Sequence, residues 1–289
     1  MPIVDLSGAY DLHIHSNPSL FTRIGNDFDM ARHAAETGLA GILLKNHFES
    51  TVGRAAQADA AVEETRVFGG LVLNGFAGGI NPLAVENALG LGAKQIWMPT
   101  IDAVGHATVF GKPGGYGYQD TVTTVARPAI GILDENGTLT EATKTVVALI
   151  QDAGAILGTA HLSREEIFAL ADHARAQGFD KLLITHPYFN PPQLSVDDQK
   201  ILVEKGALLE LCGGNLYPIP GTARLSNYLE TIQAVGTAPL VLSSDAGQPR
   251  KSLPQEVLRI FAQCLMEKGI TQEEIDRMTK INPARLLGI

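Results

Sequence analysis

The feature that most constrains the fold is an eightfold alternation of short apolar runs with longer amphipathic stretches. The apolar runs are rich in Val, Ile, Leu and Met and have the length of strands. The stretches between them carry apolar residues at three- and four-residue spacing, which is typical of helices. This alternation predicts repeated strand–helix units around a parallel sheet. We expect strands over residues 10–15, 41–47, 66–73, 95–101, 155–161, 181–186, 207–212 and 239–245.

Chain length selects among parallel-sheet topologies. The 289 residues are the usual length of one closed barrel of eight strand–helix units. The connections are short and none has the composition of a linker. We therefore expect one (β/α)8 barrel, a TIM barrel, forming a single domain over residues 1–289. A doubly wound open sheet is the alternative.

The longest irregular segment follows the fourth expected strand and covers residues 102–138. It is rich in glycine between residues 105 and 117. A loop of this length inside a compact domain is usually functional. We expect it to be a lid or a substrate-binding loop.

Composition and charge exclude several classes of protein. The formal net charge of −9 leaves no basic surplus to neutralise phosphates, so we expect no nucleic-acid partner. No apolar stretch reaches about 18 residues and no basic-then-apolar leader is present, so we expect no membrane association and a cytoplasmic protein. Cys212 and Cys264 form no CxxC pair, which argues against a disulfide framework or a thiolate zinc site. A small-molecule substrate fits better, and base rates for barrels favour a homo-oligomer.

A histidine pair ends the first expected strand. His13 and His15 are two residues apart, and on a strand such residues face the same side about 7 Å apart. Two imidazole rings can therefore converge on one ion. A helix would direct the same two side chains apart.

Three further strands end in side chains that can bind a metal. The strand over 155–161 ends in His161, the strand over 181–186 ends in His186, and the strand over 239–245 ends in Asp245. Active sites of such barrels are assembled from the carboxyl ends of several strands. Imidazole and carboxylate ligands suit zinc, and also manganese, iron or cobalt. We expect one or two divalent transition-metal ions, with zinc first.

These positions resemble the metal site of the amidohydrolase superfamily, and the resemblance covers nearly the whole barrel. The pattern lies in His13-Ile14-His15, His161, His186 and Asp245. The tail, with its Asn282-Pro283-Ala284-Arg285 segment, resembles the closing helices of that superfamily, which implies an extra C-terminal helix.

The resemblance implies a role for each of these residues. His13 and His15 would bind the more buried metal, His161 and His186 would bind or border a second, and Asp245 would bind metal and take a proton from its water. A bound divalent cation lowers the pKa of its water to about 7, which makes hydroxide available at neutral pH. His186 would position the water if only one metal binds.

The sequence departs from the superfamily at the fourth expected strand. Two-metal members usually place a lysine or glutamate there to bridge the ions, and the segment 95–102 has neither. Lys45, Glu210 or Asp102 could supply the bridge, and Lys45 and Glu210 could instead contact the substrate. We expect His47 to be a catalytic or ligand residue, and His106 on the long loop could reach the substrate. A site with one metal, a site with two, and the histidine-rich site of polymerase-and-histidinol-phosphatase barrels all stay open.

Together these features predict a metal-dependent hydrolase that cleaves an amide, a cyclic amide, or a lactone or ester. A one-metal decarboxylase or hydratase on the same scaffold is the first alternative, and a phosphoesterase is the second. A metabolite-binding barrel without activity is the alternative outside enzymes.

Overall fold

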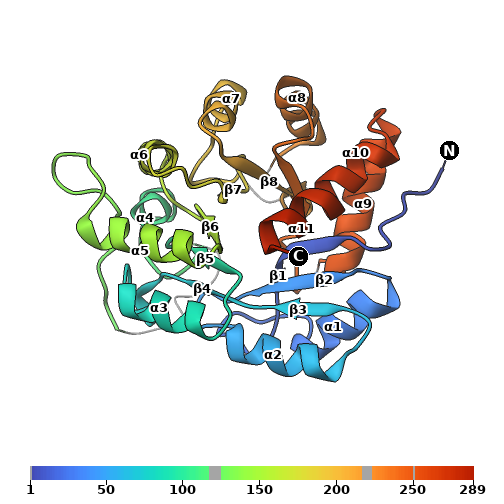
Figure 1. Cartoon of the computed structure of the whole chain (residues 1–289), viewed down its shortest axis with the longest axis horizontal. Helices are drawn as coiled ribbons and strands as arrows, with labels where there is room; N and C mark the ends of the chain where they lie inside the picture. The colour runs from blue at the N-terminus through green and yellow to red at the C-terminus, as the bar shows by residue number, and fades with distance from the viewer. Residues whose placement is uncertain (1, 117–124, 217–222, 250) are drawn as a thin grey trace.

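The computed structural model describes residues 2–116, 125–216, 223–249 and 251–289, and it confirms the (β/α)8 barrel. The strand segments of the described chain all pair in parallel. They run in sequence order around the molecule, with the helices outside them (Figure 1). The strands are β1 (Tyr10–His15), β2 (Gly41–Lys45), β3 (Arg66–Phe68), β4 (Gly70–Val72), β5 (Gln95–Trp97), β6 (Ile156–Gly158), β7 (Leu182–Thr185), β8 (Leu208–Cys212) and β9 (Leu240–Ser243).

The expected third strand is divided into β3 and β4 at Gly69. At this break Thr51, rather than a neighbouring strand, forms hydrogen bonds with the backbone of Gly70. Its backbone N–H donates to Gly70 O at 3.0 Å, and its hydroxyl accepts from Gly70 N at 2.9 Å. A Cβ on Gly69 would lie 2.6 Å from the Cα of Val52. A glycine is therefore needed where the chain before α2 (Val52–Ala61) meets the strand.

The barrel closes between its first and last strands. His15 N donates to Ala246 O at 2.8 Å, and Asp245 N donates to His13 O at 2.9 Å. These bonds join the end of β1 to the residues directly after β9. The closure therefore fixes two of the expected metal ligands, His13 and Asp245, next to each other.

Four helices are capped at their N-termini by a side chain from the residue just before them. Asn26, Ser163, Ser195 and Thr271 each form a capping box with the acidic residue three positions later. The outer helices, besides α2, are α1 (Asp27–Glu36), α3 (Pro82–Gly90), α4 (Val104–Phe110), α5 (Glu141–Asp152), α6 (Arg164–Ala176), α7 (Val196–Glu204), α8 (Leu225–Val235) and α9 (Pro254–Glu267).

The expected C-terminal helix is present and covers one end of the barrel. The chain ends in α10 (Gln272–Asp276), the π-helical turn η3 (Arg277–Ile281) and α11 (Asn282–Leu287). Lys94 and Lys181, which precede β5 and β7, donate to the carbonyl oxygens of Leu287 and Leu286 at 3.0 and 2.9 Å. Helix α11 therefore lies at the amino ends of the strands, which leaves the carboxyl ends for the site.

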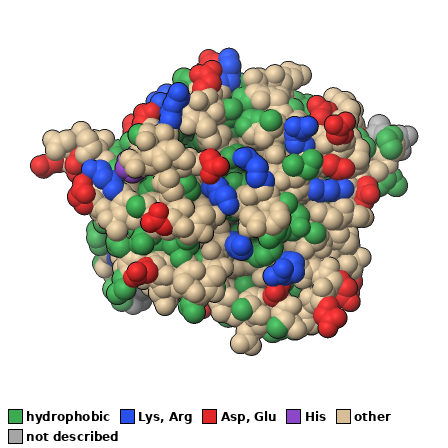
Figure 2. All heavy atoms as spheres, viewed as in Figure 1, with side chains coloured by type: hydrophobic (Ala, Val, Ile, Leu, Met, Phe, Trp, Pro, Cys, Tyr) green, Lys and Arg blue, Asp and Glu red, His purple; other side chains and the backbone are tan. Residues whose placement is uncertain are grey.

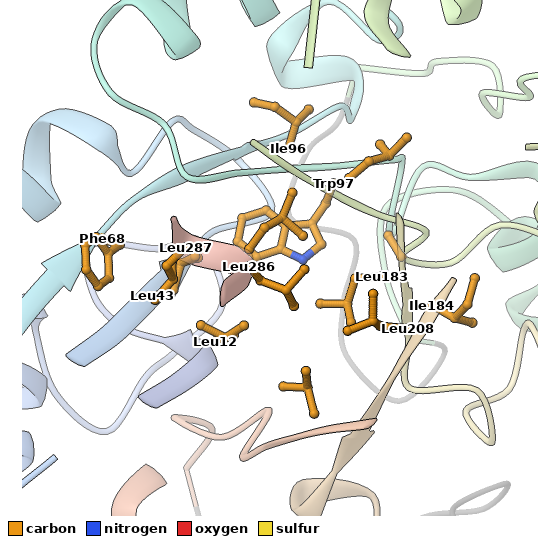
Figure 3. Packing of buried hydrophobic residues seen from close by; sticks show 14 of the residues in the cluster. Leu12, Leu43, Phe68, Ile96, Trp97, Leu183, Ile184, Leu208, Leu286 and Leu287 are labelled. Carbon is orange, nitrogen blue, oxygen red and sulfur yellow. The ribbon is translucent and has the colours of Figure 1, made fainter. Parts of the chain in front are cut away.

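Trp97 fills the centre of the barrel (Figure 3). Its side chain is fully buried, and the neighbouring strands β4 and β6 carry Gly70 and Gly158 close to its ring. A Cβ on these two glycines would lie 2.6 and 2.5 Å from the indole ring. The two glycines thus make room for the largest side chain of the core.

The segment after the fourth expected strand differs from the expectation. Residues 102–138 contain α4, and a pair of backbone hydrogen bonds joins Asp102 and Val104 to Ile130. His106, expected on a loop, lies on this helix. The expected lid includes residues 117–124, which lie outside the described residues.

Acidic and basic side chains are interspersed on the face seen in Figure 2, and little histidine reaches the surface there. None of the helices in the described ranges is both long and apolar enough to cross a membrane.

Candidate metal centre and active site

Three of the expected ligands meet at the carboxyl ends of β1 and β9. Nε2 of His13 and Nε2 of His15 lie 3.3 and 3.2 Å from Oδ1 of Asp245. Potential ligand atoms of the three residues all lie within 4.8 Å of one another. The two histidines are buried, and the side chain of Asp245 is 15% exposed. This set is therefore compact, and Asp245 is the most exposed of its three side chains.

Hydrogen bonds fix which ring nitrogen of each histidine faces Asp245. Nδ1 of His15 lies 3.1 Å from the carbonyl oxygen of Lys45, which can only accept, so the proton is on Nδ1. Nδ1 of His13 lies 3.3 Å from Oε2 of Glu210 and donates to this carboxylate. In the neutral rings both Nε2 atoms then carry a lone pair. Two such nitrogens and a carboxylate oxygen fit a divalent transition-metal ion.

Asp245 stands in a backbone conformation that is rare for residues other than glycine, with φ of +48°. Burial alone would raise its pKa, but the surrounding rings of His13, His15 and His186 together hold the pKa well below its usual value. Asp245 is therefore ionised at neutral pH. An ionised carboxylate at this position can bind a cation or accept a proton.

Lys45 lies at the centre of this group. Its Nζ is 3.1 Å from Nε2 of His13 and 5.3 Å from the ring centre of Trp97. Burial lowers the pKa of Lys45, and Asp245 and Glu210 oppose this effect. The structure thus places Lys45 against His13, one of the expected metal ligands.

Glu210 contacts Nδ1 of His13, whereas Asp245 faces Nε2 on the other side of the same ring. It is fully buried, with Oε2 on His13. Its other oxygen, Oε1, has no hydrogen-bond partner among the described residues. A buried carboxylate in this position orients the ring of His13.

His161 and His186 lie next to the compact set but outside it. The His186 ring is 6.0 Å from that of His13 and 5.2 Å from that of His161. His186 also has a positive φ, of +34°. Burial lowers the pKa of His186 to about 3, so the ring is neutral. His186 therefore lies between His13 and His161.

His106 orients His161. Nε2 of His106 donates to Gly115 O at 2.7 Å, and burial lowers the pKa of this ring to about 4. In the neutral ring Nδ1 therefore carries no proton. It lies 3.0 Å from Nδ1 of His161 and accepts a hydrogen bond from it. Nε2 of His161 is left with a lone pair, as in His13 and His15.

His47 lies two residues after the end of β2, between the two histidine groups. Its ring stacks on that of His15 at 5.1 Å and lies 6.3 Å from that of His161. Its Nδ1 is 2.8 Å from the hydroxyl oxygen of Thr100, which also contacts Asn74. Neither Thr100 nor Asn74 was expected in the site, because uncharged polar residues carry no distinctive spacing.

Aromatic side chains line the histidines. The Phe21 ring lies 5.7 Å from His47, Phe110 lies 4.4 Å from His106, and Phe189 lies 4.8 Å from His186. Tyr116 is 6.3 Å from His47. The site thus combines polar histidine side chains with neighbouring aromatic side chains, as small-molecule sites commonly do.

Gly247 allows the close approach of the chain after β9 to β1. Its φ is +120°, and a Cβ there would lie 1.8 Å from the carbonyl oxygen of His15. We expect Gly247→Ala to lower the free energy of unfolding by about 1–3 kcal/mol more than Gly206→Ala does. Gly206 has φ of +97° and open space around its Cβ position. Urea unfolding followed by circular dichroism measures both, and equal losses would contradict the clash.

Solved structures with the same fold were found at low sequence identity. A probable dipeptidase, PvdM, from Pseudomonas aeruginosa has a TM-score of 0.63 and 14% identity, over 97% of this chain and 94% of that one. A probable 2-pyrone-4,6-dicarboxylic acid hydrolase from Acinetobacter baumannii has a TM-score of 0.62 and 14% identity, over 98% and 100%. An amidohydrolase from Pseudomonas aeruginosa has a TM-score of 0.61 and 12% identity, over 97% and 95%.

The chain therefore has the fold of these solved structures, one of which is an amidohydrolase. No curated protein matches the sequence significantly. The model of a protein family of unknown function, DUF6282, matches residues 8–210, which is well over half of the chain. This segment includes His13, His15, His161 and His186, and Asp245 follows it. The chain belongs to the family of unknown function DUF6282.

Proposed function

We propose that this protein is a metal-dependent hydrolase that cleaves an amide, a cyclic amide, or a lactone or ester bond of a small metabolite. The observation that carries the proposal is the convergence of two bare imidazole nitrogens and one ionised carboxylate at the strand ends. The similar structures named above as a dipeptidase, a pyrone dicarboxylic acid hydrolase and an amidohydrolase support it through their common fold.

His13, His15 and Asp245 would hold the first ion, with zinc favoured and manganese, iron or cobalt as alternatives. His161 offers a further bare nitrogen next to them, and His186 lies between the two groups. When bound, a divalent ion supplies Lewis-acid activation of water at neutral pH. Glu210 would orient His13 for this role, so we propose it as a positioning residue.

The chain's own residues supply the proton transfer. Asp245 is ionised and has the exposure needed to meet substrate, so it would accept the proton of the attacking water and pass it to the leaving group. The aromatic wall of Phe21, Tyr116 and Phe189 would pack against the apolar part of the substrate and exclude water.

Metal content is the first test of this proposal. We expect about one or two transition-metal ions per chain in wild type purified without added metal, measured by inductively coupled plasma mass spectrometry. His13→Ala should lose them, because it removes one of three converging ligands. His33→Ala is the matched control, since His33 lies on α1 away from these ligands, with its side chain 39% exposed. Absence of bound metal after loading with zinc, manganese, iron or cobalt would contradict the proposal.

The reaction class is tested with a substrate panel in water enriched in oxygen-18. Lactones, cyclic amides, dipeptides and chromogenic carboxyl esters should include a substrate whose product gains one oxygen-18 atom. Turnover without label in the product would indicate the decarboxylase alternative. Turnover of a chromogenic phosphate ester alone would indicate the phosphoesterase alternative.

A further inference from the structure

The tautomer of His47 can be worked out from the groups behind it. These groups are Asn74, which follows β4, and Thr100, which follows β5; both are fully buried. They form one chain of hydrogen bonds that ends on Nδ1 of His47. The direction of each bond decides which nitrogen of His47 carries a proton.

The amide of Asn74 has its orientation fixed by four contacts. Its Oδ1 accepts from the backbone N–H of Thr100 at 2.8 Å and of Asp102 at 3.3 Å. Its Nδ2 donates to His47 O at 2.9 Å and to the hydroxyl oxygen of Thr100 at 2.7 Å. A flipped amide would place its oxygen against the carbonyl oxygen of His47 and its nitrogen against two N–H donors. Thr100 therefore receives a proton from Asn74.

The hydroxyl of Thr100 must then send its own proton elsewhere. Among the described residues, Nδ1 of His47 at 2.8 Å is the acceptor in reach. A buried hydroxyl proton without an acceptor is costly. Thr100 thus donates to Nδ1 of His47, and in the neutral ring the proton lies on Nε2.

This tautomer is opposite to that of the three neighbouring histidines. In His13, His15 and His161, Nδ1 carries the proton and Nε2 is bare. The difference has a local cause: these three face an acceptor behind the ring, whereas His47 faces a donor. His47 therefore differs from these three potential ligands, because its Nε2 is an N–H donor.

We infer that His47 is a hydrogen-bond donor to the substrate rather than a metal ligand, and that Asn74 and Thr100 are positioning residues that hold it in the Nε2–H tautomer. Its recipient would be the oxygen of the scissile bond that gains negative charge during attack. This second half rests on the proposed hydrolase function; the tautomer does not.

Nitrogen-15 NMR of histidine side chains tests the tautomer directly. A protonated and a bare ring nitrogen differ widely in chemical shift, and both signals correlate with the ring protons. In metal-free protein we expect His47, assigned by its loss in His47→Gln, to show protonated Nε2 and bare Nδ1. After addition of zinc alone, the Nε2 signals of His13 and His15 should shift while that of His47 stays protonated. A bare Nε2 on His47, or its shift to a metal-bound value, would overturn the inference.

Thr100→Val and Thr100→Ser form the matched pair for the positioning role. Valine has the shape of threonine but no hydroxyl, so we expect His47 to lose its single tautomer and kcat to fall roughly 10- to 100-fold with little change in KM. Serine keeps the hydroxyl and should restore both the NMR signature and kcat. An unchanged His47 tautomer in Thr100→Val would overturn the positioning role. Failure of wild type to hydrolyse any substrate would refute only the proposed function, because the NMR result is obtained without substrate.

Discussion

Asp245→Asn is expected to reduce the hydrolysis rate roughly 10²- to 10⁴-fold. The amide cannot accept a proton from the attacking water, and it is a weaker metal ligand than a carboxylate. It also removes the negative charge that His13, His15 and His186 surround. The measurement is kcat/KM on whichever panel substrate shows oxygen-18 incorporation, together with the metal content of the same preparation.

The control for this variant is Asp152→Asn, which changes an exposed carboxylate at the end of α5. It should keep the wild-type rate and metal content. If Asp245→Asn binds metal as wild type does but loses turnover, proton transfer is the main role of Asp245. If it retains full turnover, Asp245 has no part in the mechanism and the proposed function fails.

The sequence was sufficient to predict the barrel and to identify the chemically distinctive strand-end residues. Strands have a period of two, so His13 and His15 could be assigned to one face once residues 10–15 were identified as a strand. Parallel strands all end on the same side, which relates β1 to β9 without any knowledge of distances. Asp245, 230 positions away from His15, could therefore be expected beside it.

The same reasoning failed where glycine has a packing role. Gly105 favoured a loop in the sequence, but it lies in α4, where a Cβ would be 2.8 Å from the backbone oxygen of His161. Gly69 interrupts a strand for a similar reason. In both cases the glycine permits close approach of two backbones, which depends on the partner segment and cannot be read locally.

Residues that orient the site were also missed. Thr100 and Asn74 act on His47 through hydrogen bonds of ordinary polar groups, and no spacing distinguishes them from other buried threonines and asparagines. Their role follows from donor and acceptor directions, which require coordinates. By contrast, Glu210 was noticed because a carboxylate among apolar residues is unusual, although its position behind His13 could not be foreseen.

Asp11 is expected to make the metal-free protein lose stability as the pH rises. Its Oδ1 accepts from His13 N and Ser244 N, which link β1 to the residue after β9, while Oδ2 is buried without a partner in the described chain. Burial raises the pKa of Asp11 from 3.8 to about 7. Below pH 4 the folded and unfolded chains both bind this proton. Above it the unfolded chain releases the proton first, so unfolding becomes easier until the pH passes about 7.

A rise from 3.8 to about 7 corresponds to about 4 kcal/mol in the free energy of unfolding, at about 1.4 kcal/mol per pH unit. Asp11→Asn cannot titrate, so its stability relative to wild type should increase by up to this amount between pH 4 and pH 8. Urea unfolding in EDTA across this range measures the difference, and Asp152→Asn should show no such trend. A constant difference between Asp11→Asn and wild type would mean that Asp11 is ionised in the folded protein throughout. The closure between β1 and β9 would then be held by a charged carboxylate rather than by a neutral acid.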